Sequence, residues 1–239
     1  MMRLDKLVGE LGIATRSEAK KIIRKGLIII DGCPYKNPDE KVDEAKVKLQ
    51  YLGNEYFYKK FHYYMLNKPS GVVSATYDNH DKTVIDIFRE KNNGMVVSDL
   101  FPLGRLDKDT VGLLVVSNDG ELAHKLLSPK YHVPKTYYVE TLKNITEEDI
   151  RILENGVDLG DFVTKEATVK LLSDKSCEIT ISEGKFHQVK RMFIAVNNEV
   201  IYLKRVTFGP LTLDERLNEG EFRELEPDEI ERLNLCSRK

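Results

Sequence analysis

Hydrophobic positions near the start of the chain follow first a helical and then an extended spacing. Leucine and valine recur within residues 4–11 at the interval of an amphipathic helix, and a glycine follows. Thr15-x-x-Glu18 is a capping-box pattern that opens a second helix, which Gly26 ends. Residues 27–30 then predict a strand closed by an Asp-Gly turn, and residues 42–49 predict its partner. The result is a helix–helix–strand module near the lower size limit for an independent core.

The rest of the chain mixes strands and helices after a polar, aromatic stretch without periodicity at residues 53–61. We place the domain boundary there, with domains at 1–58 and 59–239. Strands outnumber helices and are separated by hairpin-length gaps, which favours an α+β fold with a mixed, mainly antiparallel sheet over a doubly wound parallel sheet. Strands are expected at 112–117, 136–141, 166–172 and 177–182, and helices at 121–128, 146–156 and 187–197.

Composition narrows the class of protein. The chain has 239 residues, of which 41% are hydrophobic and 32% charged, enough apolar material for a packed core. It contains no apolar run long enough to span a bilayer and no secretory signal, so we expect no membrane association. Three widely spaced cysteines exclude a disulfide framework and suit a reducing cytoplasm. Histidine spacing gives no zinc-protease pattern, and we expect no metal.

Charge is distributed unevenly. The net charge is -2, but residues 1–60 carry 13 Lys+Arg against 9 Asp+Glu, whereas residues 211–239 carry 9 acids and 5 bases. This pattern predicts a cationic N-terminal face and an acidic, solvated tail.

The second predicted helix carries most of the N-terminal positive charge. Arg16, Lys20 and Arg24 are spaced to share one face, with Lys21 and Lys25 alongside. Such a face can pair with several phosphates, although for a lone run of this length a solvated helix surface is the better explanation. The order Arg3-Leu4-Asp5-Lys6, Gly12, Arg16-Ser17-Glu18-Ala19, Ile23-Arg24-Lys25-Gly26, Asp31-Gly32 resembles the S4-type RNA-binding domain over about residues 2–50, which implies RNA binding but no reaction.

Three further segments carry candidate chemistry. Asp107 and Asp109 form a carboxylate pair on a polar turn before an apolar strand, where either could instead cap the turn. Tyr137 and its neighbour Tyr138 point to opposite faces of a strand, so one is expected in the core and the other is free to stack on a base. His187, Lys190 and Arg191 lie near a helix N-terminus, which suits a phosphate or a carboxylate, or is simply an exposed basic patch.

Five segments in the same order resemble the small-subunit rRNA pseudouridine synthase A family. Valines and a serine at 115–117 stand where leucines and threonine are usual. The segments are Tyr64-Met65-Leu66-Asn67-Lys68-Pro69-x-Gly71, Gly104-Arg105-Leu106-Asp107 with Thr110-x-Gly112-Leu113-Leu114, Lys135-x-Tyr137-x-Val139, Gly184-Lys185-Phe186-His187-Gln188-Val189-Lys190-Arg191-Met192, and Leu203-Lys204-Arg205 with Gly209-Pro210-Leu211.

The resemblance implies isomerisation of a uridine in RNA to pseudouridine, without cofactor or metal. It makes Asp107 the catalytic aspartate, acting either as a nucleophile or by assisting loss of the C2′ proton. Lys190 would pair with Asp107, and Tyr137 would stack on the base and is a candidate general base. The expected RNA-binding residues are Arg105, Asn67, Lys68, His187, Gln188, Arg191, Arg3, Arg16, Lys20, Lys21, Arg24 and Lys25.

The expected partner is 16S ribosomal RNA, within a small-subunit assembly particle, bound by a monomer in the cytoplasm. Chain length, a short tail after the catalytic motifs and the segment at residues 66–69 favour the small subunit. One alternative is a relative that modifies 23S rRNA. The other is a non-catalytic RNA-binding or ribosome-assembly factor, against which the presence of Asp107, Tyr137 and Lys190 argues.

Overall fold

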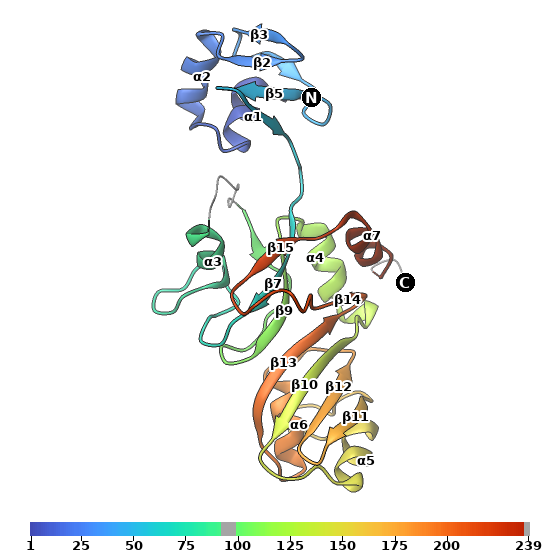
Figure 1. Cartoon of the computed structure of the whole chain (residues 1–239). Helices are drawn as coiled ribbons and strands as arrows, with labels where there is room; N and C mark the ends of the chain where they lie inside the picture. Colours follow the sequence, from blue (N-terminus) through green and yellow to red (C-terminus); the bar gives the residue numbers. More distant parts are fainter. Residues whose placement is uncertain (92–98, 237–239) are drawn as a thin grey trace. The chain divides into compact units, whose positions relative to one another are not determined.

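The chain forms two compact units, one built mainly from Met1–Phe61 and the other mainly from His62–Phe88 and Asp99–Lys239 (Figure 1). A computed structural model describes residues 1–91 and 99–236. Each unit has its own hydrophobic core. In the part of the chain that the structure describes, no helix has both the length and the apolar character needed to cross a bilayer.

The first unit packs two helices against small antiparallel sheets. Strands β3, β2, β5 and β6 are neighbours in that order, and β1 pairs with β4. The helices contribute Leu4, Leu7 and Ile23 to its core. The elements are β1 Met2–Arg3, α1 Leu4–Glu10, α2 Arg16–Arg24, β2 Ile28–Ile30, β3 Cys33–Tyr35, β4 Lys41–Val42, β5 Lys48–Tyr51 and β6 Asn54–Phe57.

Local sequence signals in this unit are confirmed with one exception. Thr15 and Glu18 form the expected capping box at the start of α2. The Asp-Gly turn has positive φ at both residues, as a tight hairpin requires. The single strand expected over 42–49 is wrong, because the backbone amides of Lys46 and Val47 both donate to the carbonyl of Asp43 and turn the chain between β4 and β5.

The second unit is organised around one large, mixed sheet. Its main path runs β11-β12-β10-β13-β9-β7-β15, with β14 paired to β13 and β8 to β9. Neighbours on the path are antiparallel except β13 and β9, which pair in parallel. This confirms the α+β prediction. The strands are β7 Tyr63–Lys68, β8 Phe101–Pro102, β9 Val111–Ser117, β10 Lys135–Thr141, β11 Thr168–Ser173, β12 Ser176–Ile181, β13 Val200–Phe208, β14 Leu211–Thr212 and β15 Phe222–Glu224.

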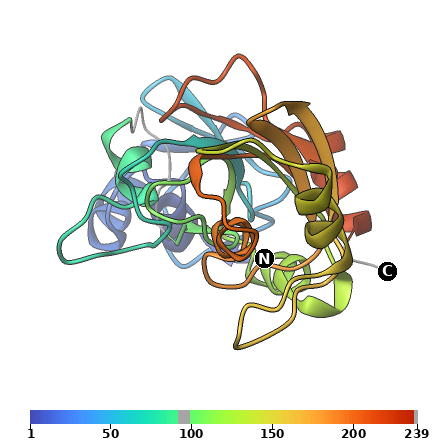
Figure 2. The ribbon, with the colours of Figure 1, turned by 90° about the horizontal axis from the view of Figure 1, so that it is seen from below.

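Helices pack against this sheet and against one another. Helix α6 contacts β13, α5 contacts β11, and α4 packs beside α7. Seen from below, α6 lies within the curve of the sheet (Figure 2). The sequence predicted α4, α5 and α6, including the Thr146 cap of α5, but neither α3 nor α7. The helices are α3 Val84–Glu90, α4 Gly120–Leu127, α5 Glu147–Asn155, α6 Gln188–Ala195 and α7 Pro227–Cys236.

The parallel pairing of β9 with β13 requires a glycine. Gly112 has a φ of 102° and faces Arg205 across the pair. A Cβ at this position would overlap the backbone of Arg205. Because every residue of β9 is buried, the strand cannot move outward to make room. Gly112 therefore fixes how closely the two central strands approach, immediately after the turn that carries Asp107.

The expected acidic, solvated tail is wrong for residues 211–236. This segment contributes β14, β15 and α7, and Leu225 and Leu233 are buried in the core. Two of its acids are partnered rather than solvated, since Arg223 lies 2.7 Å from both an Asp214 and a Glu229 oxygen. Residues 237–239 lie outside the described residues.

Candidate active site

Hydrogen bonds from two buried side chains hold the turn between β8 and β9 in place. The Ser74 hydroxyl donates to the carbonyl of Leu106 at 2.9 Å and accepts from the Leu106 amide at 3.0 Å. The Lys68 ammonium donates to the carbonyls of Lys108 and Thr110 at 3.2 and 2.9 Å. Asp107 thus stands on a backbone fixed on both sides, as a catalytic group requires.

Neither Asn67 nor Lys68 is available for the direct RNA contact that the sequence predicted. Lys68 is 0% exposed, and a third hydrogen bond, to the carbonyl of Pro69, completes the set around its ammonium. Burial lowers the pKa of Lys68 to about 8. Asn67 is also buried and donates to the carbonyl of Leu217. Both side chains therefore act on the protein's own backbone, and Lys68 acts on the Asp107 turn.

Asp107 lies within a cluster of charges that α6 completes. Lys190 Nζ is 3.1 Å from Asp107 Oδ2 and 2.5 Å from Asp109 Oδ1. His187 Nε2 is 3.7 Å from Asp107 Oδ1. The expected neighbour of Asp107 is present, but it is shared with a second carboxylate. Lys190 therefore bridges the two acids of the turn.

The pKa shifts of this cluster follow from the ion pairs. Burial alone would lower the pKa of Lys190, but hydrogen bonds with Asp109 and Asp107 outweigh it and raise the pKa. Burial would likewise raise the pKa of Asp109, and the Lys190 ammonium instead holds it below its usual range. Both partners therefore stay charged at neutral pH.

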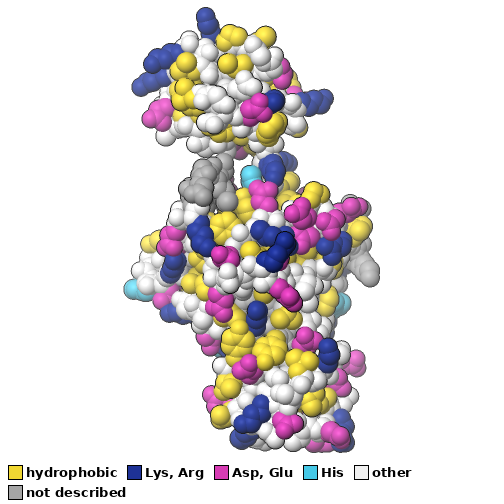
Figure 3. All heavy atoms as spheres, in the orientation of Figure 1, with side chains coloured by type: hydrophobic (Ala, Val, Ile, Leu, Met, Phe, Trp, Pro, Cys, Tyr) yellow, Lys and Arg dark blue, Asp and Glu magenta, His cyan; other side chains and the backbone are white. Residues whose placement is uncertain are grey.

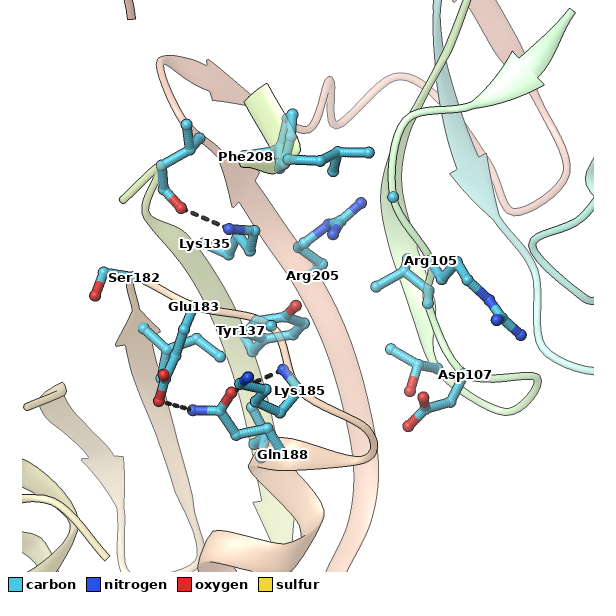
Figure 4. A pocket seen from close by; sticks show the side chains of 18 of the residues that line it. Arg105, Asp107, Lys135, Tyr137, Ser182, Glu183, Lys185, Gln188, Arg205 and Phe208 are labelled. Carbon is cyan, nitrogen blue, oxygen red and sulfur yellow. Dashed lines mark hydrogen bonds between the residues drawn. The ribbon is translucent and has the colours of Figure 1, made fainter. Parts of the chain in front are cut away.

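A cavity of about 360 Å³ opens beside Asp107, within the size range of small-molecule sites. Arg105 and Asp107 lie on one wall, and Tyr137 from β10 and Arg205 from β13 lie on the opposite wall (Figure 4). Tyr137 is buried in register opposite Arg205, whereas the alternation along its strand predicted only that either Tyr137 or Tyr138 is in the core. No three His, Cys, Asp or Glu side chains gather in metal-binding geometry within residues 1–91 and 99–236.

Two cationic residues of the cavity were quoted in the motifs but given no role by the sequence. Arg205 is 2% exposed; its Nε donates to the carbonyl of Leu113, and its Nη2 has no hydrogen-bond partner among the described residues. Lys135 donates to the carbonyl of Val133 at 2.6 Å. Burial, and then the charge of Arg205, lower the pKa of Lys135 to about 8. Only the register of β10 against β13 reveals that these two cations meet beside Tyr137.

The other predicted binding residues of this unit differ in their access to a ligand. Arg105 is exposed and lines the cavity. Gln188 is buried and ties its own loop together, accepting from the Lys185 amide and donating to Glu183. Arg191 donates to the carbonyl of Leu159 and pairs with Asp161. Gln188 and Arg191 thus have structural partners, whereas Arg105 is open to a ligand.

The cationic residues of the first unit fall into two sets. The buried Asp5 carboxylate forms ion pairs with Arg3 at 2.9 Å, Arg16 at 3.5 Å and Lys20 at 3.9 Å. The Arg3 guanidinium lowers the pKa of Asp5. Lys21, Arg24 and Lys25 are exposed, and no ion pair involves Arg24 or Lys25 among the described residues. Figure 3 shows the basic side chains along the edge of the unit formed by α2.

Comparison with known families assigns both units. The family model of RNA pseudouridylate synthase matches residues 62–195, more than half of the chain, and that of the S4 domain matches residues 2–47. The first unit is therefore an S4 domain and the second a pseudouridine synthase domain.

Full-length relatives agree with this assignment. The chain is 38% identical to the ribosomal small subunit pseudouridine synthase A of Haemophilus influenzae, covering 97% of this chain and 99% of that one. It is also 38% identical to the ribosomal large subunit pseudouridine synthase B of Bacillus subtilis, with 99% and 97% covered. A crystal structure of a pseudouridylate synthase matches with a TM-score of 0.68 and 36% identity, over 98% of this chain and all of that one. This chain belongs to the RNA pseudouridine synthase family and is an isomerase with an N-terminal S4 domain.

Proposed function

We propose that this enzyme converts one uridine of 16S ribosomal RNA to pseudouridine, with Asp107 as the catalytic residue. The observation that carries the proposal is the placement of the Asp107 carboxylate on a fixed turn, 3.1 Å from Lys190, at the wall of a cavity that Tyr137 lines from the other side. Domains at 1–58 and 59–239 would divide the work into RNA binding and catalysis.

The reaction rearranges bonds without net loss of atoms or electrons. The bond between N1 of uracil and C1′ of the ribose breaks, the base turns within the site, and a bond forms between C5 and C1′. The proton on C5 leaves and N1 gains one. Asp107 serves either as nucleophile toward C1′ or by assisting loss of the C2′ proton. Both routes need a carboxylate at this position, and the Lys190 ammonium pairs with it at 3.1 Å.

The remaining residues would orient the nucleotide. Because the uridine must leave its stack to expose C1′, base flipping costs a few kcal/mol. Tyr137 offers a ring on which the flipped uracil can stack, and its hydroxyl is a candidate general base. Arg105, exposed at the cavity, is placed to hold the extruded nucleotide. Contacts of the S4 domain with remote phosphates can offset the cost of flipping.

The choice of 16S over 23S rRNA is the finer part of the proposal. It rests on the resemblance of residues 66–69 to the small-subunit family. Equal identity to the small-subunit and large-subunit relatives supports 23S rRNA as the second candidate. We further propose a monomer acting in the cytoplasm on a partly assembled small-subunit particle.

The test is to map pseudouridine across 16S and 23S rRNA from cells with and without the gene. Loss of one modification in 16S rRNA, restored by the wild-type gene and not by Asp107→Asn, is the expected result. Loss of a modification in 23S rRNA would establish the second candidate. Identical maps would leave a non-catalytic RNA-binding or assembly role.

A matched measurement separates catalysis from folding. Purified Asp107→Asn should keep the wild-type unfolding midpoint within a few degrees and bind 16S rRNA, because Asp107 makes no backbone hydrogen bond through its side chain in the described structure. It should form no pseudouridine in the same RNA. Product formation by this variant would refute the assignment of Asp107.

A further inference from the structure

An aromatic pair with no role in the proposed chemistry lies beside the cavity, which one of its members, His187, lines. Phe186 is 77% exposed, the most exposed phenylalanine of the described residues. Its ring stacks on that of His187, with centroids 3.9 Å apart and planes inclined by 16°. Covered on one side by His187, the Phe186 ring is a flat apolar surface presented to solvent. Such a surface suits another planar group.

The backbone places this pair beside the reacting carboxylate. His187 adopts the left-handed conformation, with a φ of 48° and a ψ of 33°, immediately before α6. A non-glycine residue rarely takes this conformation, and such strain occurs preferentially at functional sites. His187 also lines the cavity and lies 3.7 Å from Asp107. The Phe186 ring therefore stacks on a residue that itself approaches the Asp107 carboxylate.

The loop that carries Phe186 is held by hydrogen bonds and has lysines on both sides of it in the sequence. Buried Gln188 bonds to the Lys185 amide and to Glu183, so the loop is ordered without a ligand. Lys185 precedes Phe186 directly in the chain, and Lys190 of the following helix pairs with Asp107, which His187 also approaches. Aromatic rings among basic side chains are the usual composition of a single-stranded nucleic acid site.

We propose that Phe186, backed by His187, is a stacking platform for the nucleobase adjacent to the uridine that enters the cavity. The proposal rests on Asp107 being the reaction centre. Flipping a uridine removes a stacking partner from its neighbour in the strand, and the Phe186 ring replaces it. The platform is a binding site for a second nucleotide, separate from the pocket that holds the reacting one.

The test is a thermodynamic cycle between the ring and the base. The probe is a seven-nucleotide RNA with one central uridine between adenosines, and two further probes are abasic immediately before or after the uridine. We expect Phe186→Ala to weaken binding of the intact RNA about tenfold and to have no effect on one of the abasic probes. Phe186→Leu, which keeps an apolar side chain, should behave as Phe186→Ala, and Phe186→Trp as the wild type. Circular dichroism confirms that each variant is folded.

Every outcome decides the proposal. The proposal is overturned if Phe186→Ala weakens binding of intact and abasic RNA equally, or if the Leu and Trp variants bind with equal affinity. It is also overturned if Phe186→Ala causes no loss of affinity, which would leave the Phe186 surface for a protein partner. Formation of pseudouridine in full-length rRNA by the wild type is measured in parallel. If pseudouridine forms but the Phe186 ring and the neighbouring base show no coupling in binding, the platform alone is refuted. If they are coupled but no pseudouridine forms, the proposed function alone is refuted.

Discussion

Lys68 and Gly112 show how single residues that need not contact RNA determine where Asp107 stands. Lys68 holds the carbonyls on the far side of the turn, and Gly112 lets the following strand approach β13. Both lie in the segments that resemble the family, but they shape the backbone around Asp107 and do not contact a substrate themselves. From the sequence, Lys68 was expected to meet RNA, because a lysine in a motif gives no sign that its ammonium is buried.

Replacing Gly112 tests the close approach of the two strands. Gly112→Ala should lower the free energy of unfolding by about 3 kcal/mol, because the added Cβ meets the Arg205 backbone at a positive φ. Urea denaturation measures the change. Gly120→Ala is the control, since nothing lies within 4 Å of its added Cβ in α4, and it should change stability by at most about 1 kcal/mol. Equal midpoints for the two variants would contradict this account.

The buried ammonium of Lys68 should make stability depend on pH in the alkaline range. Its folded pKa of about 8 lies below the value of 10.5 for an exposed lysine. Between these values the unfolded chain binds more protons, so this residue's contribution to stability rises with pH. Relative to Lys68→Met, the wild type should gain about 1 kcal/mol per pH unit between pH 8 and 9.5.

The measurement is the unfolding free energy of both proteins at several pH values, since the difference cancels groups common to both. Lys135, whose pKa is also lowered to about 8, should give a slope of the same sign in Lys135→Met. Curves that stay parallel to the wild type for both variants would show that neither ammonium is desolvated.

At the level of elements, the sequence predicted correctly those helices and strands whose own residues mark them, by a capping box or by alternation. The capping boxes at Thr15 and Thr146 and the alternation at 136–141 correspond to α2, α5 and β10. Helix α7 was not predicted, because its acids resemble a solvated tail until Arg223 is seen to bind Glu229. The sharing of Lys190 by two aspartates and the meeting of Arg205 with Tyr137 depend on strand register and helix position, which local patterns do not contain.

Helix α2 offers a test of the cationic surface. Binding to 16S rRNA weakens as salt rises, and the slope of log K, the binding constant, against log salt concentration counts phosphate contacts. Replacing both Arg24 and Lys25 by alanine should make this slope less steep by about 1 to 2. Arg16 should contribute less, since it already neighbours buried Asp5. Titrations at four salt concentrations measure the slope. Lys46→Ala, at an exposed lysine 3.4 Å from Asp43, serves as control and should leave the slope nearly unchanged; an unchanged slope in the double variant would exclude α2 as a phosphate contact.

For the whole molecule, two separate cores indicate two units that can fold separately. The first unit buries Leu4, Leu7 and Ile23, while the second buries residues such as Leu113 and Phe208 around β9 and β13. Two binding modules on one chain raise affinity for a large RNA beyond that of either alone.

Removal of residues 1–58 should therefore weaken binding to full-length 16S rRNA by at least about tenfold and leave the kcat for a saturating RNA within about twofold. Quantitative binding and turnover assays give the two values, and the unfolding transition of the truncated protein establishes that it is folded. A truncated enzyme that binds as tightly as the full chain would mean that the S4 domain contributes nothing to recognition.

The pairing of β15 with β7 also constrains how the protein can be made. Strand β7 is the first of its sheet to leave the ribosome, yet one of its edges stays open until residues 222–224 have been synthesised. The S4 domain can fold while translation continues, as N-terminal domains generally do. Until residues 222–224 are synthesised, the edge of β7 that β15 covers is unpaired, and an unpaired strand edge is a template for pairing with another chain.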